Sequence, residues 1–286
     1  MPIAVIAFDF DPLVRLGPDL TVRWQTLALA VVVLVCLAGA GVLARRSGLR
    51  ADDLLYVVIG AAPGAVVAGR IGYAVVVPEA FSAGPLSLFD PAVGGLELGT
   101  AVAGGIGSAA IVAALLGSQV GRWAHIASIP LLAAISAGKL TMVLGGSGQG
   151  LPFDGDWATA YVGAGPWVAA APAVPSHPSQ VYEAVGTALV ALVILAASSL
   201  GVFRSADGSR LLAAVAGWGV ARAVVSLTWR DPVVGGLPAG GLIALIISVA
   251  SLIGILAVSL WWPRRQQARA AAAEPHWPEA EVRPPF

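Results

Sequence analysis

Residues 177–200 read HPSQVYEAVGTALVALVILAASSL, a polar opening followed by an apolar run long enough to cross a membrane. A helix needs about 20 mostly apolar residues to cross the hydrocarbon core. The opening holds His177, Gln180 and Glu183. Polar and ionisable groups are costly at the edge of a membrane span, and they usually mark a site rather than packing. This stretch therefore predicts a transmembrane helix with a functional site where it begins.

Apolar runs of similar length recur about seven times along the chain. They lie near residues 24–43, 54–77, 99–116, 123–144, 179–200, 211–227 and 237–262. Only 11% of the residues are charged and 58% are hydrophobic, whereas soluble domains carry about 25% charged residues. We therefore expect an all-α, polytopic membrane protein with about seven transmembrane helices.

The sequence divides into two unequal parts. Residues 1–262 are expected to form one membrane-embedded helical domain that includes a long outer loop, residues 145–178. Residues 263–286 are rich in Arg, Ala and Pro, and are expected to form a flexible cytoplasmic tail.

Basic residues predict how the helices are oriented. With seven spans, most arginines outside the spans fall on one side of the membrane: Arg45, Arg46, Arg50, Arg122, Arg204, Arg210, Arg264, Arg265 and Arg269. Because cytoplasmic loops carry the excess of Lys and Arg, the N-terminus should lie outside and the C-terminus in the cytoplasm. The first 11 residues have no basic segment, so we do not expect a cleavable signal peptide. The formal net charge is zero, and no nucleic-acid partner is expected.

The polar residues within and beside the spans converge on the outer leaflet. In this topology Arg70, Lys139 and Arg222 each lie in the outer half of a span. The same level also holds polar residues at the ends of spans: Gln25, Glu97, Gln180, Glu183, Arg230 and Asp231. Each residue alone could be explained without a functional site. Its side chain could snorkel to the lipid headgroups, or it could form an ion pair with another of these residues. As a set, however, the cations outnumber the nearby carboxylates and predict a site for an anion. A phospholipid phosphate is the obvious candidate.

His177 and the aromatic outer loop allow two interpretations each. His177 could titrate at the charged level, or it could be a solvated hydrogen-bonding residue at the interface. The aromatic residues of the loop, Trp157, Tyr161 and Trp167, could anchor it in the membrane interface or form a lid. The glycine-rich segment 145–150 follows an apolar span rather than a strand, so a nucleotide-binding loop is not expected there.

Four short motifs, in this order along the chain, resemble one family. They are Phe10-Asp11-Pro12, Gly69-Arg70-Ile71-Gly72-Tyr73, His177-Pro178-Ser179-Gln180-Val181-Tyr182-Glu183, and Arg222 followed by Arg230-Asp231-Pro232. The third is quite specific and the others are weaker. Together they resemble the prolipoprotein diacylglyceryl transferases, seven-span enzymes of the bacterial inner membrane, from about Phe8 to Trp261.

The resemblance implies a reaction at the outer leaflet. A diacylglyceryl group would move from phosphatidylglycerol to the thiol of the lipobox cysteine in the signal peptide of a preprolipoprotein. The partners would be these two substrates and membrane lipids, and no metal or cofactor is implied. The implied catalytic residues are His177, Glu183 and Arg222. Binding of the phospholipid phosphate would fall to Arg70, Lys139, Arg222, Arg230, Gln180 and Tyr182.

The chain departs from the family pattern after its fourth span. Where the family reads roughly Gly-Arg-x-x-Asn-Phe-x-Asn-Gly-Glu, residues 138–147 read GKLTMVLGGS. A family histidine corresponds to Gly99, a tyrosine to Gln25 and a glutamate to Ser226. Two interpretations therefore stay open. The protein is a divergent transferase, or it is a catalytically silent paralogue that binds phospholipid or a lipoprotein precursor. A transporter is less well supported, because the sequence has no internal repeat.

Overall fold

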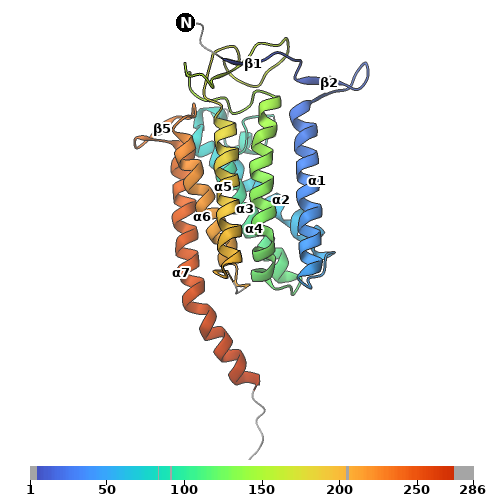
Figure 1. Cartoon of the computed structure of the whole chain (residues 1–286), viewed down its shortest axis with the longest axis vertical. Coiled ribbons are helices and arrows are strands. Elements are labelled where there is room, and N and C mark those ends of the chain that lie inside the picture. The colour runs from blue at the N-terminus through green and yellow to red at the C-terminus, as the bar shows by residue number, and fades with distance from the viewer. Residues whose placement is uncertain (1–4, 83, 91, 204–205, 274–286) are drawn as a thin grey trace, which may run out of the picture.

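In the part of the chain that the structure describes, the apolar runs fold into seven long helices that lie side by side in one bundle (Figure 1). Their bounds are α1 Trp24–Arg46, α2 Asp53–Val76, α3 Leu98–Leu115, α4 Val120–Thr141, α5 Ser179–Ser199, α6 Ser209–Ser226 and α7 Ala239–Ala273. The computed structural model describes residues 5–82, 84–90, 92–203 and 206–273. The predicted all-α fold is confirmed, and each helix begins within a few residues of its expected position.

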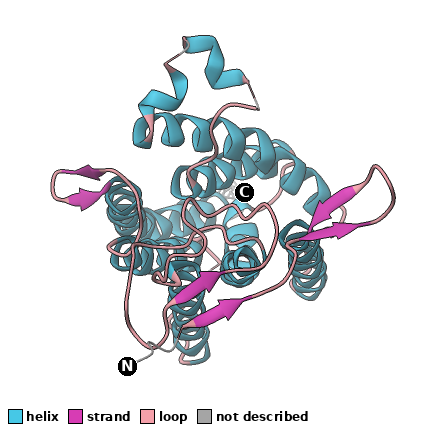
Figure 2. Ribbon diagram, turned by 90° about the horizontal axis from the view of Figure 1, so that it is seen from above, coloured by secondary structure: helices cyan, strands magenta, loops and turns pink. Residues whose placement is uncertain are grey.

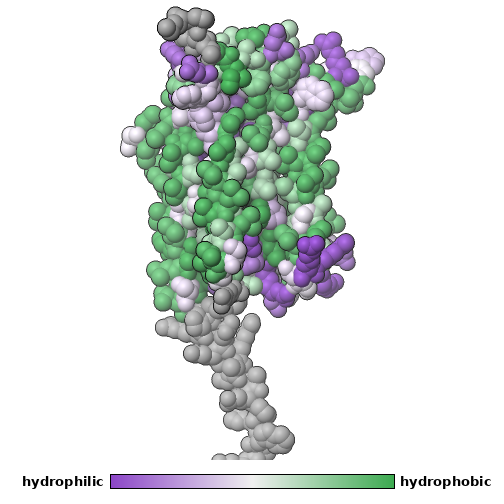
Figure 3. Space-filling model, viewed as in Figure 1, coloured by the Kyte–Doolittle hydropathy of each residue, from purple (hydrophilic) through white to green (hydrophobic). Residues whose placement is uncertain are grey.

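Six of these helices are long and apolar enough to cross a membrane, and α6 is the exception. The six turn large hydrophobic side chains outward, which gives the bundle the apolar belt seen between two more polar ends (Figure 3). The helix α6 contains Arg210 and Arg222, but it lies against α4, α5 and α7. Much of its surface therefore contacts protein rather than lipid. The chain is a multi-pass membrane protein.

Small residues let two helices approach closely. α2 packs along α3, and a Cβ atom on Gly64 would come within 2.4 Å of the Gly104 carbonyl oxygen. A Cβ atom on Gly72 would come within 2.1 Å of Thr100 Oγ1. Small residues at such positions allow van der Waals packing between backbones, which stabilises helix pairs in lipid.

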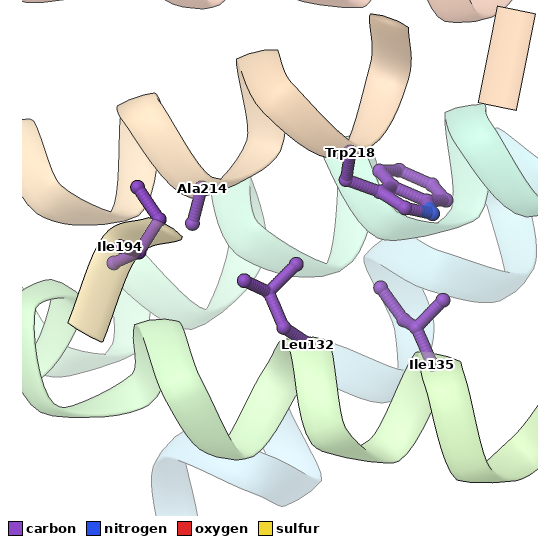
Figure 4. Close-up of a cluster of buried hydrophobic side chains, with 5 residues drawn as sticks. All are labelled: Leu132, Ile135, Ile194, Ala214 and Trp218. Carbon is purple, nitrogen blue, oxygen red and sulfur yellow. The ribbon is translucent and has the colours of Figure 1, made fainter. Parts of the chain in front are cut away.

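The core of the bundle lies between α4, α5 and α6. Leu132 and Ile135 of α4 point toward Ala214 and Trp218 of α6, and Ile194 of α5 closes the cluster (Figure 4). This cluster fixes how α6 sits against α4, and α6 also carries Arg222. The apolar core thus determines the position of Arg222 along the bundle relative to α4.

Three two-stranded sheets and the longest loop cover one end of the bundle (Figures 1 and 2). β2 (Leu13–Arg15) pairs with β3 (Thr21–Arg23), and β5 (Val233–Val234) pairs with β6 (Leu237–Pro238). β1 (Ile6–Phe8) pairs in parallel with β4 (Thr159–Tyr161) of the loop between α4 and α5. Phe8 also stacks on Tyr161 with ring centroids 5.1 Å apart. The N-terminal segment is therefore tied to the long loop, and we call this end of the molecule the capped end.

The expected tail, residues 263–286, continues α7 as far as Ala273. Residues 274–286 lie outside the described residues, and the flexibility of the tail stays a prediction. The same holds for the orientation of the two ends relative to the membrane.

Candidate active site

A cavity of about 540 Å³ opens at the capped end of the bundle. Residues from the five helices α2 to α6 and from three loops line it, so segments far apart in sequence meet there. The lining residues are Tyr73, Val76, Val77, Glu79, Leu96, Glu97, Leu98, Lys139, Gly148, Gln149, Gln180, Glu183, Arg222, Trp229, Arg230, Asp231 and Pro232.

Four charged side chains form a continuous network in this cavity. Arg222 donates from Nη1 to Glu183 Oε1 at 2.5 Å and from Nη2 to Glu97 Oε1 at 3.0 Å. Lys139 Nζ lies 2.7 Å from the other oxygen of the same carboxylate, Glu183 Oε2. Glu183 is 1% exposed and Arg222 is 5% exposed. Charges buried this deeply require such partners, because an unpaired charge in an apolar interior is strongly unfavourable.

Local structure places Glu97 at the beginning of α3. Its two carboxylate oxygens accept from the backbone N–H groups of Gly99 at 2.9 Å and Thr100 at 2.6 Å, as an N-cap side chain does. Burial alone would raise the pKa of Glu97, but the Arg222 guanidinium and these two N–H groups outweigh burial and lower the pKa below its usual value. Glu97 is therefore an anion that both caps a helix and holds an arginine.

Trp229 forms an aromatic wall beside the two cations. The Arg222 guanidinium lies 4.4 Å from its ring centroid, and Lys139 Nζ lies 5.8 Å from it. Cations over an aromatic face are stabilised by its quadrupole, more so where water is excluded. Arg222 Nε has no hydrogen-bond partner among the described residues.

Arg230 and Asp231 complete the cavity from the loop after α6. Arg230 donates from Nε to the Gly150 carbonyl at 2.6 Å and from Nη2 to Ser176 Oγ at 3.0 Å, so it joins this loop to the long outer loop. Burial raises the pKa of the Asp231 carboxyl group, although Arg222 and the Gly240 N–H oppose the rise. Asp231 is in no ion pair among the described residues.

Arg70 lies outside the cavity lining. Its guanidinium donates to four backbone carbonyls of the loop between α2 and α3, those of Ser87 (3.1 Å), Leu88 (2.9 Å), Asp90 (2.8 Å) and Val93. The structure therefore does not bring Arg70 together with Lys139 and Arg222. Its donors hold the loop that carries Glu79 and Leu96 into the cavity wall.

His177 and Tyr182 belong to an aromatic cluster where the long loop meets α5, rather than to the cavity lining. The His177 ring stacks on Phe153 with centroids 4.0 Å apart, and its Nδ1 lies 3.4 Å from Tyr182 Oη. Tyr182 Oη accepts from Trp157 Nε1 at 2.7 Å. Burial lowers the pKa of His177, so its neutral form is favoured.

The expected excess of cations is wrong for this cavity. Three cations line it, and four carboxylates accompany them: Lys139, Arg222 and Arg230 against Glu79, Glu97, Glu183 and Asp231. The sequence count included Arg70, which points elsewhere, and gave too little weight to acidic residues in loops. Glu97 and Asp231 adjoin apolar runs, which places them at the predicted charged level, and both line the cavity. No signal of this kind marks Glu79, Gln149 or Trp229, which folding alone brings to the cavity.

A second cavity, of about 470 Å³, lies between α1, α2, α3 and α4 and is lined almost entirely by apolar side chains such as Leu37, Val58, Ile106 and Leu131. Leu98 lines both cavities. A charged chamber therefore adjoins an apolar one, which is the arrangement that an amphiphile with a polar head and acyl chains requires.

The sequence profile of the prolipoprotein diacylglyceryl transferases matches residues 12–258, most of the chain and all the elements of this cavity. The chain belongs to the prolipoprotein diacylglyceryl transferase family. The family is one of transferases, and relatives from several bacteria align over nearly the whole chain.

Three of these relatives show the extent of the similarity, and each is described as a phosphatidylglycerol–prolipoprotein diacylglyceryl transferase. The protein of Methylocella silvestris is 29% identical over 285 residues, which covers 94% of this chain and 100% of the relative. The protein of Paramagnetospirillum magneticum is 27% identical over 283 residues, covering 95% and 100%. The protein of Solidesulfovibrio magneticus is 34% identical over 208 residues, covering 66% and 72%.

Proposed function

We propose that this protein transfers the diacylglyceryl group of phosphatidylglycerol to the lipobox cysteine of a preprolipoprotein at the outer leaflet of the bacterial inner membrane. The observation that carries the proposal is the pair of adjoining cavities in a chain of this family. The buried Lys139–Glu183–Arg222–Glu97 network provides a fixed polar end, and the apolar cavity between α1 and α4 provides room for acyl chains.

The chemistry would need a cationic seat for the leaving phosphate. As the cysteine sulfur bonds to the terminal diacylglyceryl carbon, that carbon's bond to the phosphate oxygen breaks, and glycerol phosphate leaves with the electron pair. Lys139 has N–H donors beyond its pair with Glu183, and Arg230 has donors beyond its two loop contacts. These groups would stabilise the growing charge, while Glu97 and Glu183 hold Arg222 in place.

The cysteine must lose its proton, because the thiolate is the nucleophile. Both carboxylate oxygens of Glu183 are already paired, one with Lys139 and the other with Arg222, so neither is free to face the thiol. We assign the role to Asp231, which lines the cavity outside any described ion pair and whose pKa burial raises toward the working pH. Glu183 then acts as a positioning residue, and His177 organises the outer loop.

A second candidate is a silent lipid-binding paralogue. The observation that favours it is that every cation of the central network is already matched by a carboxylate. Such a protein would hold a phospholipid or a lipoprotein precursor without turnover.

Complementation separates the two candidates. A strain depleted of its own diacylglyceryl transferase would express this protein, and lipid attachment to a reporter lipoprotein would be measured. Attachment that disappears with Arg222→Ala, and with a reporter whose lipobox cysteine is replaced by serine, supports the transferase. Absence of attachment from a membrane-inserted protein that still binds phosphatidylglycerol supports the silent paralogue.

A further inference from the structure

Two buried glutamine side chains in the cavity wall each carry a carbonyl oxygen without a partner. Gln149 is 7% exposed and Gln180 is 2% exposed, and neither Oε1 atom has a hydrogen-bond partner among the described residues. Buried polar atoms are usually satisfied, so two orphaned acceptors in one cavity need an explanation. Both glutamines line the same cavity, and Gly148, the residue before Gln149, lies beside Gln180, because a Cβ atom on Gly148 would come within 3.5 Å of Gln180 Cβ.

The amide of Gln149 can be oriented in only one way. Its Nε2 group donates to three backbone carbonyls of the outer loop, those of Thr159 (3.2 Å), Pro172 (3.4 Å) and Val174 (3.1 Å). A rotated amide would set its oxygen against these three oxygens. Gln180 likewise donates from Nε2 to Tyr161 Oη at 2.8 Å. In both residues the donors face the loop, and the remaining polar atom is an acceptor.

An acceptor oxygen repels a phosphate and attracts an N–H or O–H donor. The expected role of Gln180 in binding phosphate would therefore fall to the second Nε2 hydrogen, since the first is donated to Tyr161 and the Oε1 atom can only accept. Arg230, which would face the phosphate, donates to the carbonyl of Gly150, the residue after Gln149. A group bound next to that phosphate would share the cavity with the two amide oxygens. That group is the headgroup alcohol of the phospholipid.

We propose that Gln149 and Gln180 recognise the headgroup of the bound phospholipid by accepting hydrogen bonds from its hydroxyl groups. The two acceptors are neutral amides, and the buried carboxylates Glu97 and Glu183 are already paired with Lys139 and Arg222, so this wall suits a neutral polyol. The inference rests on the proposed function for the identity of the lipid, but it concerns binding and not turnover.

Two phospholipids of equal charge test it. Phosphatidylglycerol and phosphatidylethanol are both phosphodiesters, and only the first has headgroup hydroxyls. Purified full-length protein in phosphatidylcholine nanodiscs would be titrated with each lipid against a fluorescent phosphatidylglycerol. We expect a preference of about tenfold for phosphatidylglycerol, the effect of one or two hydrogen bonds in a buried site. Equal affinity for the two lipids would overturn the proposal.

A matched pair of variants separates recognition from loop anchoring. Gln149→Lys keeps N–H donors for the three loop carbonyls but removes the amide oxygen, and Gln149→Glu keeps an acceptor but removes the donors. We expect the lysine variant and Gln180→Met to lose the headgroup preference, and the glutamate variant to retain it. A preference that survives Gln149→Lys and is lost in Gln149→Glu would show that Gln149 only ties down the loop.

Two further measurements show which headgroup group donates the hydrogen bond, and which of the two proposals fails if one does. Stronger binding of phosphatidylethanolamine than of phosphatidylglycerol would overturn the hydroxyl assignment in favour of an ammonium headgroup. A preference for phosphatidylglycerol in a protein that fails the complementation assay would support headgroup recognition while removing the transferase proposal. The two proposals therefore fail separately.

Discussion

Two arginines in the membrane-spanning helices, Arg70 and Arg222, look alike in sequence and do different work in the fold. Both lie in the second half of their helix, α2 (Asp53–Val76) or α6 (Ser209–Ser226), where the helices approach the capped end. Arg222 donates to the carboxylates of Glu97 and Glu183 inside the cavity. Arg70 gives its donors to backbone carbonyls of one loop, outside the cavity lining. The N–H donors of a cation within a membrane span need acceptors. Those acceptors can be carboxylates in a site or backbone carbonyls in a loop.

The two arginines also differ in their access to a substrate. Glu97 and Glu183 hold Arg222 beside Trp229, where a substrate can meet it. The carbonyls around Arg70 give it no net countercharge, and its guanidinium also lies 5.0 Å from the Phe81 ring centroid. We infer that Arg70 shapes the cavity through its loop, whereas Arg222 is part of the charged network that faces the substrate.

The largest effect is expected for Arg222→Ala. It would leave two buried carboxylates without their shared partner, and breaking a buried ion pair costs about 3–5 kcal/mol of stability. Transfer to a reporter lipoprotein should fall about 1000-fold. Arg222→Lys is the control, since it keeps the charge but cannot donate to Glu97 and Glu183 in the same fork geometry. Near-normal transfer by both variants would remove Arg222 from the site.

Asp231→Asn should act on turnover and stability in opposite directions. We expect about 100-fold slower transfer, because the proton acceptor is lost. At neutral pH the variant should unfold about 2 °C higher, because a half-buried carboxylate is replaced by a neutral amide. As pH falls through the raised pKa toward the ordinary value, the wild-type carboxyl group becomes neutral, so this gain should shrink toward zero. Thermal unfolding at several pH values measures the gain. A gain that grows on acidification would contradict the assigned environment.

Arg70→Ala should lower transfer about tenfold through the loop that it holds. The loss should appear mainly as weaker substrate binding, and limited proteolysis between α2 and α3 should become faster. Glu79→Gln, a change in the same loop that leaves the Arg70 contacts in place, should not increase proteolysis. Loss of turnover in Arg70→Ala with an unchanged proteolysis pattern would show that Arg70 faces the substrate. The proposed difference between Arg70 and Arg222 would then be wrong.

The smallest effect is expected for His177→Phe. A phenyl ring can preserve the stacking on Phe153, and His177 does not line the cavity. Transfer should change by less than about threefold, within the range of a lost weak hydrogen bond. Its pH profile should match that of the wild type. A large loss in a stable protein would place a proton-transfer role in the outer loop, outside the cavity described above.

The sequence alone determined the membrane class, the helix positions and most of the charged level, because hydropathy and the cost of a buried charge act locally along the chain. It could predict Glu183 and Arg222 as site residues for the same reason. Only the tertiary structure decided which cations share a chamber. The donors of Arg70 turn to a loop, and Gln149 reaches the cavity from a segment tied to Thr159 and Val174. These outcomes depend on contacts between distant segments, and no local pattern specifies which acceptor a long side chain will meet.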